Sequence, residues 1–184
     1  MIRKLVNKFW ISATVLVLCG CQNLRPEEIA LPNYPDLEAL YSMQYKALGS
    51  SKLEKEISLD GAHEVKAFAM DTSKWKEELA FLKEINPKKP EYVGTYQRVK
   101  EGSSERLTLI DGENSILKNL SIEYTAEEYR SIAAVIHEDK DVYVHHRTID
   151  ISFEEGRISN WSIEGYQKIM LKDTIWFTIS GKVN

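Results

Sequence analysis

The segment VYVHHRTIDISFEEGRISNWSIEGYQKI, residues 142–169, decides the fold of this chain. Its two halves, 142–153 and 157–169, alternate apolar and polar side chains with a period of two, which is typical of strands that bury one face. The turn-forming pair Glu155-Gly156 lies between them. A connection this short joins antiparallel neighbours, because a parallel crossover needs a dozen or more residues. The segment therefore predicts a hairpin of two long strands.

The same period continues through the whole C-terminal half. We expect seven strands there, over 92–100, 105–111, 115–124, 131–138, 142–153, 157–169 and 174–181. Turn-like sequences separate them, such as Asp111-Gly112 and Lys172-Asp173. Because no helical period intervenes, the strands are expected to follow one another as an antiparallel meander.

Before residue 92, the spacing of apolar residues indicates two helices as well as a short hairpin. A helix is expected from near Tyr34, with Asn33 as its N-cap and Gly49 at its end. A short hairpin follows, in which Asp60-Gly61 joins two alternating segments, 53–59 and 65–70. A second helix, over 72–85, presents one apolar face and ends at Asn86-Pro87; that face consists of Trp75, Leu79, Leu82 and Ile85.

The predicted fold class is therefore α+β. It consists of an antiparallel β-meander sheet of about seven strands, open or closed into a barrel, with two N-terminal helices and a short β-hairpin. On strand 157–169 we expect Trp161, Ile163, Gly165, Gln167 and Ile169 to face the core and Tyr166 to lie on the half-covered face. On the last strand we expect a core face formed by Ile175, Phe177 and Ile179.

The N-terminus differs from the rest of the chain. Residues 1–8 carry three basic side chains, and residues 9–18 form the apolar run FWISATVLVL. A basic region followed by an apolar one predicts a secretory signal peptide. A helix of ten residues spans about 15 Å, half of the hydrocarbon core of a bilayer, so this run is too short to cross a membrane.

The apolar run ends in Leu18-Cys19-Gly20-Cys21, which resembles a bacterial lipobox. The resemblance implies cleavage between Gly20 and Cys21 and attachment of diacylglycerol to the Cys21 sulfur. It also implies an acyl chain such as palmitate on the new amino group. Two or three acyl chains anchor a protein stably, at ~0.8 kcal/mol per buried methylene. Beyond these covalent lipids at Cys21, no cofactor is expected.

The lipobox resemblance also predicts where the chain resides. Gln22 follows the modified cysteine, whereas Asp at that position retains lipoproteins in the inner membrane, so the cell outer membrane is favoured. Surface-export signals place acidic residues directly after the cysteine. Here Glu27-Glu28 come later, which favours the periplasmic face over the cell surface.

Three parts of the chain are therefore expected: a signal peptide over 1–20, a lipidated tether over 21–34 and a single α+β domain over 35–184. Removing the signal peptide removes three of the 24 basic residues and none of the 28 acidic ones, which leaves 21 against 28 and a net charge of −7. An acidic surface of this kind argues against nucleic acid as a partner. The mature domain keeps no free cysteine, because Cys19 leaves with the signal and Cys21 carries the lipid.

The histidines are the first candidates for metal binding or acid–base chemistry. His145 and His146 are adjacent on a predicted strand, so their side chains point to opposite faces of the sheet and cannot share one ion. His137, across a turn, could approach either, and Asp150 could complete a site. The simpler interpretation is that these histidines lie on the sheet surface. We expect no metal, and His145 and Tyr166 are the candidate ligand-binding residues.

Catalytic motifs are also missing from the sequence. Asp139-Lys140-Asp141 lacks the glycine and the distal glutamate of a calcium loop. Gly102-Ser103-Ser104 lacks the frame of a nucleophile elbow, and no phosphate-binding glycine frame occurs. We therefore expect a protein that is not an enzyme.

The order of elements resembles that of a group of small uncharacterised lipoproteins from Bacteroidetes-type bacteria. Their pattern is a lipobox, a helix, a short hairpin, a helix containing Trp, and a meander that ends in a segment like Ser162-Ile163-Glu164-Gly165-Tyr166-Gln167-Lys168. The resemblance covers most of the mature chain, but it implies no activity and no site residues.

Three hypotheses about function follow. The leading one is a non-catalytic, membrane-anchored lipoprotein with a binding or envelope-assembly role and, as partner, another envelope protein. The alternative is a carrier or binder of a lipid, another apolar ligand or a glycan on a curved sheet. The third is a metal-assisted hydrolase around His137 and His145 or His146.

Overall fold

The computed structural model describes residues 33–126 and 128–184. The expected signal peptide and nearly all of the expected tether, including Gly20 and Cys21, lie outside the described residues. In the described part, nine strands form one antiparallel sheet in the order β2-β1-β9-β8-β7-β6-β5-β4-β3. The strands are β1 Lys52–Leu59, β2 Ala62–Ala69, β3 Tyr96–Glu101, β4 Ser104–Leu109, β5 Leu117–Thr125, β6 Glu128–Lys140, β7 Tyr143–Glu154, β8 Arg157–Ile169 and β9 Ile175–Val183.

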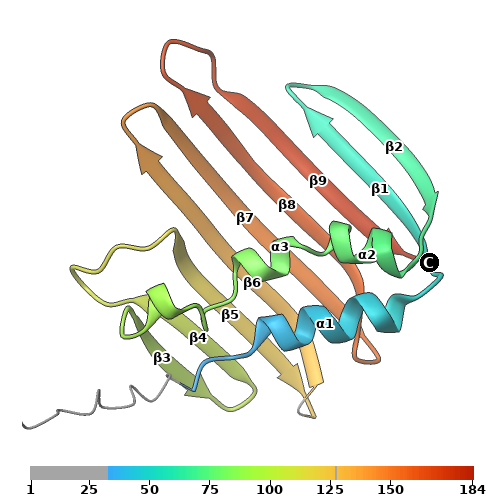
Figure 1. Ribbon diagram of the computed structural model, residues 1–184, viewed down its shortest axis with the longest axis horizontal. Helices are drawn as coiled ribbons and strands as arrows, with labels where there is room; N and C mark the ends of the chain where they lie inside the picture. Colours follow the sequence, from blue (N-terminus) through green and yellow to red (C-terminus); the bar gives the residue numbers. More distant parts are fainter. Residues whose placement is uncertain (1–32, 127) are drawn as a thin grey trace, which may run out of the picture. The chain divides into compact units, whose positions relative to one another are not determined.

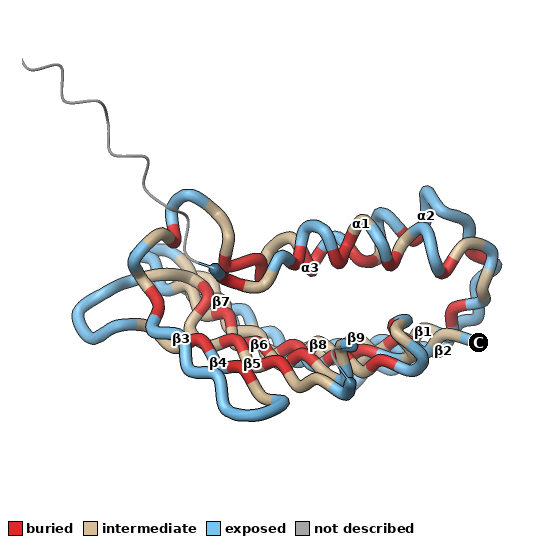
Figure 2. The backbone as a smooth tube through the Cα atoms, turned by 90° about the horizontal axis from the view of Figure 1, so that it is seen from below, coloured by how far each residue is buried: buried red, intermediate tan, exposed pale blue. Residues whose placement is uncertain are grey.

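Three α-helices and a short 3₁₀ turn complete this part of the chain. They are α1 Leu37–Leu48, α2 Thr72–Glu78, α3 Phe81–Glu84 and η1 Pro90–Tyr92. The α-helices form one layer and the sheet forms the other (Figure 2). In Figure 1 the helices cross the sheet near one end of its long strands, so the upper ends of β7, β8 and β9 carry no helix. The α+β class is therefore confirmed.

The seven predicted strands of the C-terminal half are all present, as β3 to β9. The sheet has two strands more than predicted because the short hairpin joins it. β1 pairs with β9 from Leu53↔Val183 to Leu59↔Phe177. Alternation along the sequence shows that a segment is a strand, but it does not show which strand lies beside it. The last strand consequently lies inside the sheet, between β1 and β8.

The predicted hairpin turn is confirmed. Asp60 and Gly61 have φ angles of 46° and 86°, and two positive φ values are what a two-residue hairpin turn of type I′ requires. Leu59 pairs directly with Ala62 across this turn. The second strand begins at Ala62, three residues earlier than expected.

The first helix begins three residues later than predicted. Its N-cap is Asp36, whose carboxylate accepts a hydrogen bond from the Ala39 N–H at 2.9 Å. Asn33 is therefore not the cap. The physical reason is Pro35, which disfavours helical geometry at the residue before it. Gly49 ends the helix with a φ of 50°, as expected.

The second predicted helix is divided in two. α2 ends at Glu78 and α3 begins at Phe81, with Leu79 and Ala80 between them. In a continuous helix Phe81 would lie about 240° around the axis from Trp75 and would point to the side of the apolar face. The break turns Phe81 inward, where it is 7 % exposed and packs against Trp161 at 6.1 Å between ring centroids. The four predicted core residues of this segment are all buried.

The core lies between the helices and the part of the sheet beneath them. Its sheet residues come from every second position, and Ile149, Ile151 and Trp161 are central to it. Gly181 pairs with Trp161 across β8 and β9. A methyl group placed on Gly181 would overlap the six-membered ring of Trp161. The absence of a side chain at Gly181 therefore makes room for the indole.

The predicted core face of the last strand is corrected by the structure. Ile175 is 39 % exposed, and Phe177 and Ile179 are only half-buried. All three do point to the helix side, in register with Ile163 and Gly165 of β8. They remain partly exposed because the helices cover the other end of the strand (Figure 1). The buried residue of β9 is Gly181.

We predict that Gly181→Ala destabilises the domain more than Phe177→Ala does. The alanine forces the indole of Trp161 out of place, and overpacking of this kind costs ~1–3 kcal/mol or more. Phe177→Ala removes a half-buried ring, so its cost falls below the ~3–5 kcal/mol of a fully buried phenylalanine. Urea melts of the domain from residue 22 onward measure both, with Ser180→Ala as a control within ~0.5 kcal/mol of wild type. A Gly181→Ala midpoint equal to that of the control would contradict the packing.

A second prediction concerns Gln44, which is fully buried on α1. Its amide nitrogen donates to the Gly156 carbonyl at 2.8 Å, and its amide oxygen accepts from the Ile158 N–H at 2.9 Å. Gln44→Leu leaves both backbone groups without their partner, at ~1–3 kcal/mol each. We expect a loss of ~3 kcal/mol in a urea melt. Met43→Leu, on the exposed side of α1, should leave the urea midpoint unchanged. Equal midpoints for Met43→Leu and Gln44→Leu would show that the hydrogen bonds of Gln44 do not stabilise the packing of α1.

Candidate functional site

The structure places the two predicted ligand-binding residues on opposite faces of the sheet. His145 pairs with Gln167 across β7 and β8, on the face that the helices partly cover. Tyr166 pairs with His146 and with Trp176, on the face without helices. The prediction that His145 and His146 point apart is confirmed. His145 and Tyr166 therefore belong to two different surfaces, and no single site contains both.

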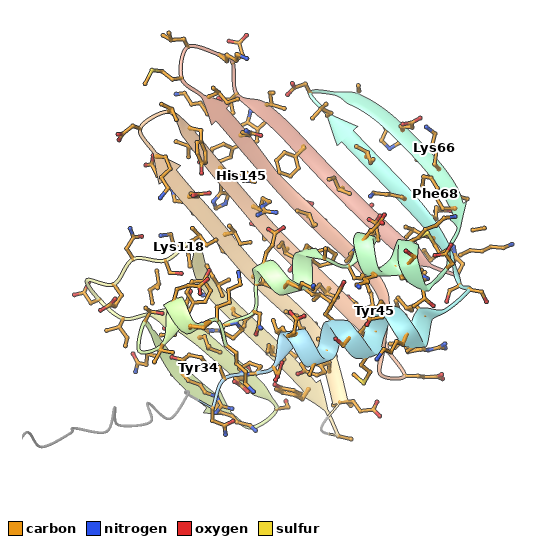
Figure 3. All side chains as sticks on the ribbon, viewed as in Figure 1. Tyr34, Tyr45, Lys66, Phe68, Lys118 and His145 are labelled. Atoms are coloured by element: carbon orange, nitrogen blue, oxygen red, sulfur yellow. The ribbon has the colours of Figure 1, made fainter. Side chains whose placement is uncertain are left out.

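On the helix side, His145 borders a group of partly exposed apolar residues that we call the apolar shelf. Their side chains lie on β1 and β9, with Ile179 at the edge of α2 and α3 and the others beyond these helices. Ile57 pairs with Ile179, and Leu59 pairs with Phe177. Leu59 is 50 % exposed and Ile57 is 37 % exposed. The shelf consists of Ile57, Leu59, Ile175, Phe177 and Ile179. The uncovered position of His145 is visible in Figure 3.

The imidazole of His145 lies 6.1 Å from the Phe177 ring, centroid to centroid. Partial burial lowers the pKa of His145, and the nearby Arg147 guanidinium lowers it further. Because a lowered pKa favours the uncharged imidazole at neutral pH, the edge of the apolar shelf formed by His145 carries no full charge there.

A groove continues from the apolar shelf beneath α2 and α3. It has a volume of about 500 Å³, within the range of ~300–1,000 Å³ that is typical of ligand pockets. Ile179 belongs to both surfaces, so the groove and the shelf are continuous. The apolar residues that line the groove are Leu53, Phe68, Met70, Ala80, Phe81, Trp161, Ile163 and Ile179.

Two ion pairs hold the helices above this groove. Lys55 Nζ on β1 lies 2.7 Å from Glu78 Oε1 at the end of α2. Arg147 Nη2 on β7 lies 2.5 Å from Glu84 Oε2 on α3. Each pair joins a helix to a strand beside the groove, so Lys55 and Arg147 are neutralised by glutamates. Lys74 also lines the groove, and its Nζ donates to the Ala69 carbonyl at 2.9 Å.

The helix-free face carries a different surface around Tyr166. His137, His146, Tyr166 and Trp176 are direct cross-strand neighbours on β6, β7, β8 and β9. We call these four residues the aromatic row. The sequence indicated that Tyr166 lies on this face, but it did not indicate the row, because only the strand register brings four positions from four strands together.

The candidate metal site is not assembled. His137 and His146 do come together, with ring centroids 5.5 Å apart. Asp150 is four residues along β7 from His146, which corresponds to ~13 Å in a strand. Within 33–126 and 128–184, no three His, Cys, Asp or Glu side chains are arranged to hold one metal ion.

Comparisons with known proteins add no assignment: no protein-family model, no curated protein and no solved structure matches this chain. Among the helices of the described residues, none is both long enough and apolar enough to cross a membrane.

Proposed function

We propose that this chain is a non-catalytic binding protein of the cell envelope, anchored to the outer membrane by lipid on Cys21, and that it binds a ligand with an acyl chain. The observation that carries the proposal is the apolar shelf, which continues into the groove beneath α2 and α3. This proposal combines two hypotheses from the sequence. The protein is the membrane-anchored lipoprotein of the leading hypothesis, and its ligand is the lipid of the alternative.

The shelf is unusual because its apolar residues are contiguous. Single exposed apolar side chains are normal on a protein surface, whereas a contiguous patch marks an interaction site. Leu59, Ile175 and Ile57 are each more than a third exposed, and they adjoin the half-buried Phe177 and Ile179. Covering such side chains with an apolar ligand is favourable by ~25 cal/mol per Å² of apolar surface removed from water.

The shape of the surface favours an acyl chain over a bulky ligand. From Ile175 to Ile179 the shelf extends over four residues of β9, which is ~13 Å in a strand. It then continues into the groove between the sheet and α2–α3. An acyl chain needs no hydrogen-bond partner, and Lys55 and Arg147 beside the groove are paired with Glu78 and Glu84. The apolar part of the ligand would therefore supply most of the affinity.

The first prediction for this function concerns the anchor. Cys21→Ala should abolish lipid attachment and signal cleavage, because Cys21 is the residue that fits the lipobox. The protein is followed by detergent phase partitioning and by its apparent mass on gels. Cys19→Ala serves as the matched control and should still be processed and membrane-bound. A Cys21→Ala protein of mature size in the detergent phase would overturn the proposed localisation.

The second prediction concerns the ligand. Membranes that contain the full chain are incubated with a diazirine derivative of palmitate and irradiated, and the adducts are mapped by peptide mass spectrometry. We expect adducts on peptides that include 57–59 and 175–179. Leu59→Glu and Ile175→Glu place a charge on the shelf and should lower labelling at least fivefold.

Val99→Glu is the matched control, because Val99 is 41 % exposed on the edge strand β3 and faces away from the shelf. It should be labelled like the wild-type protein. Equal stability of the three variants in urea shows that labelling, not folding, has changed. Unchanged labelling of Leu59→Glu and Ile175→Glu would refute the acyl-chain proposal and leave the anchor prediction unaffected.

A further inference from the structure

The aromatic row lies on the face that no helix of the described part covers (Figure 2). Its ring centroids are 5.5 Å apart between His137 and His146, 5.5 Å between His146 and Tyr166, and 5.0 Å between Tyr166 and Trp176. These spacings follow the ~4.8 Å separation of neighbouring strands, so the row extends ~15 Å across the sheet. Trp176 is its most exposed member, at 60 %.

The backbone of Trp176 is hydrogen-bonded to the turn of the hairpin that joins the sheet at β9. The backbone N–H of Trp176 donates to the Asp60 carboxylate at 2.9 Å, and the backbone N–H of Asp60 donates to the Trp176 carbonyl at 3.0 Å. This pair of hydrogen bonds fixes the backbone at Trp176 against the turn between β1 and β2. The other two tryptophans of the described residues, Trp75 and Trp161, are buried in the core.

Beside Trp176 and Tyr166 the surface is hollowed by about 460 Å³. Carboxylates and hydroxyls surround the aromatic rings there, from Asp60, Glu164, Ser58, Thr148 and Thr178. Carboxylates accept hydrogen bonds, and hydroxyls both donate and accept them. The hollow therefore combines an apolar platform of aromatic rings, whose planes are inclined to one another by 25° to 61°, with polar groups at its margin.

We infer that the aromatic row and its hollow form a second binding site, and that this site takes a neutral oligosaccharide of pyranose rings. A pyranose has a face of C–H groups, which matches the electron-rich face of an aromatic ring, and a rim of hydroxyls, which matches Asp60, Glu164 and the hydroxyl side chains. Because two carboxylates adjoin the platform, phosphates and other anions are disfavoured.

A quaternary ammonium group is the other ligand that aromatic residues and carboxylates attract. Such cations are usually held in a cage of several rings. Here the rings follow one another along a sheet, with 25° between the planes of His146 and Tyr166 and 50° between those of Tyr166 and Trp176. An extended row of this length suits consecutive sugar rings better than a compact cation.

The test uses the full chain in a polyoxyethylene detergent, which has no sugar headgroup. Binding of cellohexaose, mannohexaose, maltohexaose and chitohexaose is followed by titration calorimetry and by tryptophan fluorescence. We expect at least one of these hexasaccharides to bind and to shift the emission of the exposed Trp176. Trp176→Ala and Tyr166→Ala should each weaken this binding at least tenfold.

Tyr143→Ala is the matched control, because Tyr143 is a partly exposed ring on the opposite face of the sheet. It should bind the hexasaccharide like the wild-type protein. The proposal would be overturned if none of the four hexasaccharides bound at millimolar concentration, or if choline bound and no hexasaccharide did. It would also be overturned if the Trp176→Ala protein bound the hexasaccharide as tightly as the wild-type protein. The acyl-chain labelling of the shelf is measured separately, so either proposal can fail without the other.

Discussion

The antiparallel pairing of β1 with β9 is the contact on which both candidate surfaces depend. It places Leu59 beside Phe177 and Ile57 beside Ile179 on the helix side, which creates the apolar shelf. On the other face, the same pairing sets Ser58 beside Thr178 and brings the Asp60 turn to Trp176. Without this pairing β9 would be an edge strand with unpaired backbone groups, and neither the shelf nor the hollow would be complete.

The size of the sheet relative to its helical layer explains why apolar residues remain exposed. The long strands β6, β7 and β8 have 12 or 13 residues each, or ~40 Å, whereas α2 and α3 together are short. The ion pairs Lys55–Glu78 and Arg147–Glu84 fasten these helices over one part of the sheet. Beyond Arg147 the strands continue with the same alternation, so their apolar side chains have no layer to pack against.

Local features of the sequence predicted most of the fold. Alternation gave all seven strands of the meander, and Asp60-Gly61 gave the hairpin, because these signals lie within a few residues of each other. Long-range pairing could not be predicted. Nothing in residues 52–59 indicates that they lie beside the last strand. The exposure of Phe177 depends on how far the helices extend over β9. The alternation of apolar and polar residues in β9 gives no information on this.

For the candidate sites, too, local features could be predicted from the sequence, whereas contacts between distant strands could not. Tyr166 and the opposite orientations of His145 and His146 follow from the period of a strand. The two candidate ligand-binding residues, His145 and Tyr166, lie on different faces of the sheet and therefore belong to two surfaces. The partner of Tyr166 is His146, and Trp176 is the most exposed ring. Both depend on strand register, which the three turns between β6 and β9 determine together.

The two proposed surfaces face in opposite directions because they occupy the two faces of one sheet. Lipidation at Cys21 would limit the distance of the domain from the membrane to the reach of residues 22–33, at most ~40 Å when fully extended. A domain whose apolar shelf takes an acyl chain from that membrane turns its aromatic row away from it. The hollow at Trp176 would then be open to polysaccharide on the far side, and β1 and β9 would contribute to both contacts at once.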